Sequence, residues 1–263
     1  MNGLITLTTD FGTQDGFVGA MKGVIFSENA EARVVDLTHD VPPQDVHAGA
    51  FALAQAAAFF PPRTVHVAVV DPGVGTARRA LCVEHRGSLF VGPDNGLLSL
   101  AAPFDGSVAF VLDRMPSDWS IHPTFHGRDL FARIAARLAA GAAPADFSTG
   151  RCAPEKLQAI SIETPACERE GGDWVGQVIH VDRFGNLVTN LVGDGVEAVE
   201  IGGRRAARVT TYADVERGRL LAYLGSAGYL EVAVRDGSAA ALLSVGRGAS
   251  ALGRVRQRRG GAV

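Results

Sequence analysis

The stretch Thr64-Val-His-Val-Ala-Val-Val70 runs directly into Asp71-Pro-Gly-Val-Gly-Thr-Ala-Arg-Arg79. The first part is an apolar, β-branched run typical of a buried strand, and the proline and glycines after Asp71 turn the chain. Open α/β sheets usually build their sites at the carboxyl ends of strands, so Asp71 is a candidate site residue. A nearby arginine would favour its ionised form. On this pattern alone, a surface turn with two solvated arginines explains the residues equally well.

Strand and helix patterns alternate on both sides of this stretch, as they do in βαβ units. The predicted strands are Leu4–Thr8, Ala32–Leu37, Thr64–Val70 and a hairpin of Ala80–Glu84 with Ser88–Val91. The predicted helices are Gly16–Glu28, Asp45–Phe60 and Phe125–Arg137, with Gly141 as the terminating residue. We therefore expect residues 1–150 to form an α/β domain in which a mostly parallel sheet is flanked by helices.

The pattern changes after residue 150. Residues 151–171 mix proline, alanine and polar residues, and we interpret them as a linker. From 172 to 263 short strand-like runs recur between Gly, Asn and Asp, which indicates an all-β barrel domain ending in a frayed basic tail, Arg254–Arg259. The runs are Trp174–Val181, Leu187–Leu191, Ala206–Thr210, Leu220–Leu224, Tyr229–Val234 and Ala241–Leu243.

Composition excludes several classes of protein. The chain has 263 residues, 47% of them apolar, and a formal net charge of −3, which fits a globular protein and gives no electrostatic footprint for nucleic acid. Its three cysteines are odd in number and widely spaced, which argues against a disulfide framework or a zinc site. The sequence contains no signal peptide pattern and no membrane span, so we expect a cytoplasmic protein without a membrane partner.

Acidic residues follow three of the predicted strands. Asp10, Asp40 and Asp71 would share one edge of the sheet if those strands are parallel, and converging carboxylates on a rigid scaffold form a polar site. His126 stands at the start of a predicted helix, and Gly127 beside it leaves room for a ligand. Taken singly, such aspartates more often cap helices or turns, and such a histidine is more often structural.

The predicted β domain contains one further candidate segment. Asp182 and Asn186 flank Phe184-Gly185, and a glycine-rich turn further on offers the hydroxyl of Ser226. An amide can hydrogen-bond the edge of adenine, an aromatic ring can stack on its face, and a carboxylate can pair with an ammonium group. A tight β-turn with a core phenylalanine is the structural alternative. The chain has no nucleophile elbow, no P-loop and no histidine pair with metal-ligand spacing.

Seven motifs in one order resemble the S-adenosyl-L-methionine (SAM) hydroxide adenosyltransferases, a family related to the fluorinases and chlorinases. They are Thr9-Asp-Phe-Gly-Thr-Gln-Asp15, Val35-Asp-Leu-Thr-His39, Val70-Asp-Pro-Gly-Val-Gly-Thr76, Gly92-Pro-Asp-Asn-Gly-Leu97, Phe125-His-Gly-Arg-Asp129, Asp182-Arg-Phe-Gly-Asn186 and Gly225-Ser-Ala-Gly-Tyr-Leu230. The resemblance spans Leu4 to Val245. It implies an α/β domain followed by a β-barrel, and a homotrimer whose sites lie between subunits.

The resemblance also implies an activity: hydrolysis of SAM to adenosine and L-methionine by attack of water on the ribose 5′ carbon, with no metal and no cofactor. The family's catalytic residues match Asp71, Arg78 and His126; Arg78 would fix Asp71, and either of the other two would accept the proton. The matching substrate-binding residues are Asp10 at the ribose hydroxyls, Asp15, Asp182 and Ser226 around the methionine part, and Phe184 and Asn186 near the adenine.

Two other functions fit the same motifs. A SAM-dependent halogenase of the chlorinase type would need a halide site, but halogenating relatives have tyrosine at Asp71, and fluorinases have serine at Gly127, tryptophan at Gln44 and an inserted loop. These departures favour water as the nucleophile. A non-catalytic module that binds SAM or adenosine is the second alternative, against which the retained catalytic residues argue. Arg235 and Ala227 also depart from relatives, which leaves the adenine and methionine contacts open.

Overall fold

The computed structural model describes residues 3–162, 165–167, 172–193 and 195–255. The chain divides into two compact units, Met1–Ser161 and Ile162–Val263, each with hydrophobic core clusters of its own. In the described part of the chain, every helix is too short or too polar to span a lipid bilayer.

The first unit is built on a mixed sheet that has, within the described residues, seven strands in the order β2-β1-β3-β5-β4-β6-β7. Its elements are β1 (Leu4–Thr9), α1 (Phe17–Glu28), β2 (Arg33–Thr38), α2 (Val46–Ala57), β3 (Val65–Val69), β4 (Ala80–His85), β5 (Ser88–Pro93), β6 (Val108–Val111), η1 (Gly127–Ala132), α3 (Arg133–Ala140), 3₁₀ turns η2 (Pro144–Phe147) and η3 (Pro154–Lys156), and β7 (Arg151–Cys152).

Only half of this sheet is parallel. Strands β2, β1, β3 and β5 pair in parallel, whereas β5–β4, β4–β6 and β6–β7 are antiparallel. The predicted hairpin of β4 and β5 is confirmed, but the prediction of a mostly parallel sheet fails at the β4–β6–β7 side. Strands β6 and β7 are short, and the sequence pattern does not predict them.

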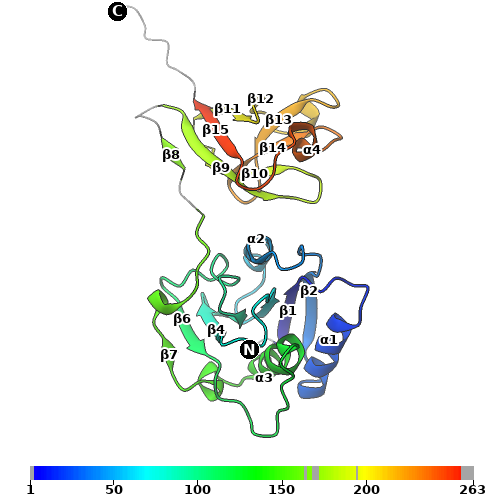
Figure 1. The fold of residues 1–263 in the computed structure, drawn as a ribbon, viewed down its shortest axis with the longest axis vertical. Coiled ribbons are helices and arrows are strands. Elements are labelled where there is room, and N and C mark those ends of the chain that lie inside the picture. Colours follow the sequence, from blue (N-terminus) through cyan, green and yellow to red (C-terminus); the bar gives the residue numbers. More distant parts are fainter. Residues whose placement is uncertain (1–2, 163–164, 168–171, 194, 256–263) are drawn as a thin grey trace, which may run out of the picture. The chain divides into compact units, whose positions relative to one another are not determined.

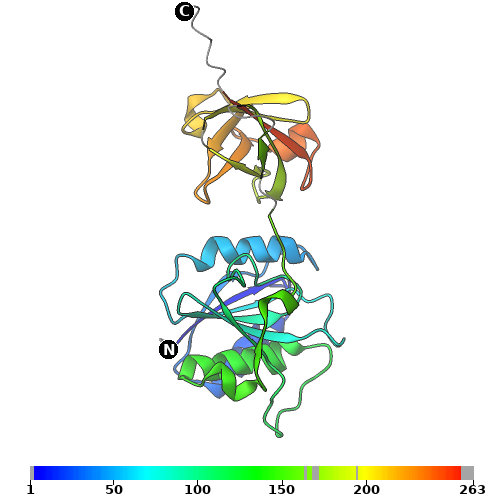
Figure 2. The same cartoon turned by 90° about the vertical axis from the view of Figure 1, so that its left-hand side faces the viewer.

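Helices cover both faces of the sheet (Figure 1, Figure 2): α2 lies on one face, and α1 and α3 lie on the other. The side chains of β3 alternate accordingly. Val67 and Val69 pack with the α1 and α3 side chains, while Ala68 and the following Val70 pack with those of α2. Asp45 begins α2 as its N-cap, since its carboxylate accepts a hydrogen bond from Ala48 N at 3.0 Å. The central strand therefore holds the loop after it on a rigid three-layer scaffold.

The predicted helix Phe125–Arg137 begins two residues later than expected. Its first segment, η1, is π-helical and continues directly into α3, which ends at Gly141 with a φ of 115°. Widened π-helical turns are frequent at functional sites. His126 is the residue that immediately precedes this segment.

The second unit is a nearly closed, antiparallel, barrel-like sheet. Its elements are β8 (Ala166–Cys167), β9 (Trp174–Val181), β10 (Leu187–Val192), β11 (Val196–Ile201), β12 (Arg204–Ala207), a 3₁₀ turn η4 (Tyr212–Asp214), β13 (Leu220–Leu224), β14 (Tyr229–Val234), α4 (Ala239–Leu243) and β15 (Ser250–Val255). The strand order is β12-β11-β15-β9-β10-β14-β13, with β8 on β9. The two ends of this path approach each other, because Val209 N donates to Ala222 O at 2.8 Å.

One predicted strand of this unit is wrong, because Ala241–Leu243 lies in the short helix α4. Ser238 caps that helix, its hydroxyl oxygen accepting a hydrogen bond from Ala241 N at 3.1 Å. A three-residue apolar run has too few positions to separate a strand from a helix. The sequence analysis also misses β11 and β15, and it begins β12 two residues too late.

Two strands lie in the described part of 151–171, the segment that the sequence analysis interprets as a linker. It begins with β7, which pairs with β6 in the sheet of the first unit, and it also contains β8, which pairs with β9 of the second unit. The division between the two units falls between Ser161 and Ile162.

The first residue of the predicted basic tail lies in a strand. Arg254 lies in β15, where its guanidinium pairs with Asp173 at 2.7 Å and with Glu200 at 2.6 Å. The prediction of a frayed segment is therefore wrong at Arg254, and residues 256–259 lie outside the described residues.

Candidate functional site

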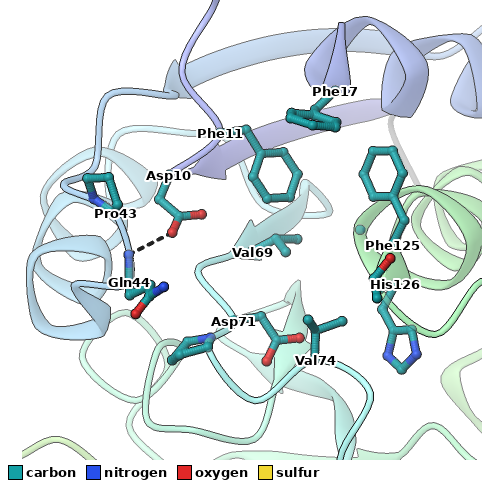
Figure 3. A pocket seen from close by; sticks show the side chains of 13 residues that line it. Asp10, Phe11, Phe17, Pro43, Gln44, Val69, Asp71, Val74, Phe125 and His126 are labelled. Atoms are coloured by element: carbon teal, nitrogen blue, oxygen red, sulfur yellow. Dashed lines mark hydrogen bonds between the residues drawn. The ribbon is translucent and has the colours of Figure 1, made fainter. Parts of the chain in front are cut away.

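A cavity of about 400 Å³ opens at the carboxyl ends of β1 and β3. Asp10 follows β1 and Asp71 follows β3, and Figure 3 shows both side chains at this cavity. Asp40, which follows β2, is exposed and is not among the lining residues. The parallel strands thus bring together two of the three predicted carboxylates.

Asp71 and Arg78 form an ion pair with side-chain exposures of only 5% and 10%. Arg78 Nε lies 3.0 Å from each oxygen of the Asp71 carboxylate, and Nη2 also donates to Oδ2. Two successive turns return the chain to Asp71: Val74 N donates to Asp71 O, and Thr76 donates to Gly73 O through both its N–H and its hydroxyl. The interpretation of this segment as a solvated surface turn is therefore wrong.

Arg78 also contacts His126, with 2.7 Å between Arg78 Nη2 and His126 Nδ1. A guanidinium can only donate, so His126 Nδ1 accepts this bond and the neutral ring carries its proton on Nε2. Burial, followed by the charge of Arg78, holds the pKa of His126 below its ordinary value of 6.5, although the carboxylates of Asp71 and Asp129 act in the opposite direction. The structure thus gathers Asp71, Arg78 and His126, and the imidazole among them is neutral at pH 7.

Three phenylalanines form the opposite wall of the cavity, as Figure 3 shows. The rings of Phe11, Phe17 and Phe125 meet edge to face, with centroids 5.6 to 6.0 Å apart. Phe17 is the first residue of α1, and 47% of it is exposed. The absence of a side chain at Gly127 leaves room for this wall, because a Cβ there would lie 3.3 Å from two Phe11 ring atoms. An apolar surface therefore faces the Asp71 carboxylate.

Asp10 is held from the other side of the cavity by the backbone. Its Oδ2 accepts a hydrogen bond from Gln44 N at 2.8 Å, and Oδ1 has no hydrogen-bond partner within the described residues. Gln44 lines the same cavity and has a φ of 65°, a left-handed conformation that is uncommon for a residue other than glycine. Asp10 can therefore present one carboxylate oxygen to a bound molecule.

The Asp182–Asn186 turn in the second unit is closed by its own carboxylate. Asp182 Oδ1 accepts from Phe184 N and Asn186 N, and Oδ2 accepts from Asn186 Nδ2 at 2.7 Å. Gly185 has a φ of 82°, which only glycine adopts readily. Phe184 is 76% exposed, so the alternative of a core phenylalanine is wrong.

A second cavity, of about 560 Å³, lies beside this turn and is lined by Phe184, Asn186 and Tyr212. Asn186 Nδ2 donates to the Asp182 carboxylate and, at 3.1 Å, to the Tyr212 hydroxyl. With both amide hydrogens engaged, Asn186 Oδ1 is left as an acceptor for a ligand.

Sequence reasoning misses a chain of hydroxyl groups behind Asn186. The Tyr212 hydroxyl contacts the Tyr223 hydroxyl at 2.7 Å, and the latter donates to the Glu231 carboxylate. Burial raises the pKa of Glu231, and the negative charge of Asp182 adds to this effect. None of these residues belongs to a recognisable motif, and only their contacts disclose the network.

Three predicted binding residues, Asp15, Asp182 and Ser226, do not line either cavity. Asp15 and Ser226 are exposed, and neither is among the residues that line them. Within the described ranges, the structure contains no group of three or more His, Cys, Asp or Glu side chains arranged to hold a metal ion.

Comparisons with known proteins agree over most of the chain. A family model described as SAM hydroxide adenosyltransferase N-terminal domain matches residues 5–148, and the corresponding C-terminal model matches residues 176–251. The chain is 44% identical over 248 residues to an (R)-S-adenosyl-L-methionine hydrolase of Salinispora tropica, covering 92% of this chain and 94% of the relative. A fluorinase of Nocardia brasiliensis is 29% identical over 275 residues, covering 88% and 89%. The crystal structure of an uncharacterised conserved protein from Thermotoga maritima superposes with a TM-score of 0.84 at 34% identity, covering 95% and 98%.

Proposed function

Because the chain belongs to the SAM hydroxide adenosyltransferase family, we propose that it hydrolyses SAM to adenosine and L-methionine at the cavity between Asp10, Asp71 and His126. The observation that carries this proposal is the double contact of Arg78, whose guanidinium joins the Asp71 carboxylate to the His126 imidazole at one cavity. The relative named as a SAM hydrolase matches 92% of the chain at 44% identity and supports the same activity.

The reaction is a displacement at the ribose 5′ carbon. The oxygen of water forms a bond to C5′ while the C5′–S bond breaks, and the electron pair of that bond goes to sulfur. L-Methionine leaves as a neutral thioether, so no group has to protonate the leaving atom. One proton of the water must go to the enzyme, and the water must be held in line with the breaking bond. Positioning and proton acceptance are therefore the tasks of the protein.

We assign the proton to Asp71. His126 uses the lone pair of Nδ1 to accept the hydrogen bond from Arg78, so its other nitrogen carries hydrogen and acts as a donor. In this arrangement His126 Nε2–H orients the water through an oxygen lone pair, and the Asp71 carboxylate accepts a water hydrogen. Arg78 fixes the carboxylate and selects the tautomer of the imidazole.

The remaining substrate contacts follow the resemblance and stay predictions. Asp10 would bind the ribose hydroxyls through its available oxygen, and Phe184 and Asn186 would stack on and hydrogen-bond the adenine. Asp15 and Ser226 would approach the methionine part. Asp182 shares that predicted role, but its carboxylate closes its own turn.

A homotrimer with its sites between subunits would explain how exposed residues such as Asp15 and Ser226 come to meet a substrate. Light scattering coupled to size exclusion would give the mass of three chains if this prediction is correct. The cytoplasmic location stays a prediction from the sequence.

Product analysis tests the reaction against both alternatives. The purified protein is incubated with SAM, with and without chloride, fluoride or a chelator, and the nucleosides are separated by chromatography. The hydrolase produces adenosine under every condition. A halogenase would give a halogenated deoxyadenosine when halide is present, and a binding module would give no product.

Asp71→Asn tests the catalytic assignment, because it preserves the shape of the side chain and removes the proton acceptor. We expect kcat to fall by about 10²–10⁴-fold with little change in KM. Asp118→Asn, at an exposed carboxylate outside the cavity, is the matched control and should retain full activity. A thermal melt of each variant distinguishes lost chemistry from lost folding. Turnover by a folded Asp71→Asn protein within twofold of wild type would overturn the assignment.

A further inference from the structure

A third cavity, of about 480 Å³, lies in the first unit near the beginning of β3. His66 lines it, whereas Asp71 stands five residues further along the same extended stretch, roughly 16 Å away at the rise per residue of a strand. The cavity is therefore distinct from the one at the carboxyl ends of the strands. Its volume is within the range of small-molecule sites.

The walls of this cavity are mostly apolar, and its polar groups are few. Alanines at the carboxyl end of α2 and the rings of Phe60 and Phe90 supply apolar surface. The polar lining residues are His66, His85, Arg86 and Ser88, and no carboxylate is among the lining residues. An apolar hollow with a small number of polar groups is the usual composition of a site that binds an organic ligand.

His66 provides the first sign that a ligand belongs here. It is only 1% exposed, its Nδ1 contacts Thr6 Oγ1 at 2.8 Å, and its ring stacks on Phe90 with centroids 4.7 Å apart. Its Nε2 has no hydrogen-bond partner in the part of the chain that the structure describes. Among the described residues, the side-chain atoms that are fully enclosed without a partner are Thr8 Oγ1, His39 Nε2 and Arg133 Nε, so His66 Nε2 keeps accessible surface and can meet a molecule in the cavity that its ring lines.

Arg86 provides the second, independent sign. It and Gly87 form the two-residue turn between β4 and β5, with φ values of 46° and 76°. Turns of this kind favour Asn or Gly at the first position, because other side chains are strained in the left-handed region. The chain nevertheless has an arginine there, and the described residues offer this guanidinium no acidic partner.

We propose that this cavity binds a small apolar monocarboxylate, whose carboxylate pairs with Arg86 and whose body lies against Phe60 and Phe90, with a polar atom meeting His66 Nε2. A single guanidinium suits one negative charge. The carboxyl end of α2, which is the negative end of its dipole, faces the cavity and repels any anion, and this repulsion is greater for a phosphate dianion than for a monocarboxylate. The ligand would thus lie at the end of the sheet opposite to the catalytic cavity.

The test uses the full chain and four probes: benzoate, 4-hydroxybenzoate, benzamide and phenyl phosphate, titrated by calorimetry at neutral pH. We expect 4-hydroxybenzoate to bind more tightly than benzoate, because its hydroxyl can reach His66, and both to bind more tightly than the uncharged benzamide. Failure of both carboxylates to bind at millimolar concentration overturns the proposal. Equal binding of benzamide, or stronger binding of phenyl phosphate, overturns the proposed ligand class.

Arg86→Gly separates binding from folding, because glycine is unstrained at this φ. We expect this variant to melt at a higher temperature than wild type while its affinity for 4-hydroxybenzoate falls at least tenfold. Arg63→Gly is the matched control, since Arg63 has a φ of 72° and does not line the cavity. It should gain stability and keep full affinity. If Arg86→Gly binds as tightly as wild type, or if the two variants lose affinity equally, the assignment of Arg86 is wrong.

Discussion

Lowering the pH from 7 to 5 should destabilise the first unit by about 2 kcal/mol through His66 alone. Burial lowers the pKa of this imidazole from 6.5 to about 4 in the folded chain, and unfolding returns it to its ordinary value. Between these two values the unfolded state binds a proton that the folded state does not. Stability is therefore complete above pH 6.5, is lost as the pH falls, and reaches its lower limit near pH 4.

The magnitude follows from the two pKa values. Each unit of difference corresponds to about 1.4 kcal/mol, so the full loss is roughly 3 kcal/mol, of which about 2 kcal/mol has developed by pH 5. The pKa values of His85 and His126 are also lowered, so the wild-type chain should lose somewhat more than this. The contribution of His66 is the difference between wild type and His66→Gln.

Urea unfolding followed by tryptophan fluorescence measures this difference. Trp119 is buried in the first unit, and a Trp174→Phe background removes the second tryptophan of the chain, so the signal reports the first unit. The exposed His47, replaced by Gln, is the matched control and should keep the wild-type pH dependence. If His66→Gln and wild type lose the same free energy between pH 7 and 5, the imidazole is not held neutral by burial, and the reasoning fails.

Three further predictions concern the proposed catalytic cavity. If His126 must be neutral, kcat/KM should rise with pH along a limb whose pKa lies below 6.5 and then stay level, and a limb above 6.5 would contradict the hydrogen-bonding scheme. Gly127→Ala should crowd the aromatic wall, which lowers kcat/KM several-fold and the free energy of unfolding by roughly 1–3 kcal/mol. Gly19→Ala is the control, because a Cβ at Gly19 meets nothing within 4 Å, and it should leave kcat/KM unchanged. Arg78→Lys keeps the charge but loses the planar guanidinium, so kcat should fall about 100-fold or more. Arg79→Lys is the control at the neighbouring position: it should lower the melting temperature and change kcat much less than Arg78→Lys does.

The scaffold is predictable where its signals are local and strong. The Thr64–Val70 run is apolar at nearly every position, which suits a strand covered on both faces, and the structure buries its residues completely or nearly so. Strands of two to four residues such as β6 and β7 carry too little periodic signal, and their place at the antiparallel side of the sheet depends on pairing partners far away in the sequence. Prediction therefore succeeds from β2 to the β4–β5 hairpin and fails at the edge formed by β6 and β7.

The contacts of the candidate site are likewise predictable where they are local in the sequence and unpredictable where they are distant. Arg78 is seven residues from Asp71, and the turn-forming residues between them make a contact foreseeable. His126 lies 48 residues beyond Arg78, so their contact requires the whole three-layer arrangement. The sequence also does not predict that Phe17 is exposed and packs edge to face with Phe11, because its helical spacing alone favours the core. Only the resemblance to a family, and not spacing, links these distant residues in advance.

Arg78 and Arg79 are neighbours that pair with different carboxylates, and the contrast bears on function. Arg79 donates to Asp94 at 2.8 Å and also contacts Cys152 Sγ, so this pair ties the end of β5 to the segment that begins with β7. Arg78 contacts Asp71 and His126 instead, both of which line the cavity that we propose to be catalytic. Burying a second ion pair adds little net stability, because the loss of hydration offsets much of the attraction. The Arg78 contacts are better explained by preorganisation, since one guanidinium fixes the carboxylate and sets the imidazole tautomer before any substrate arrives.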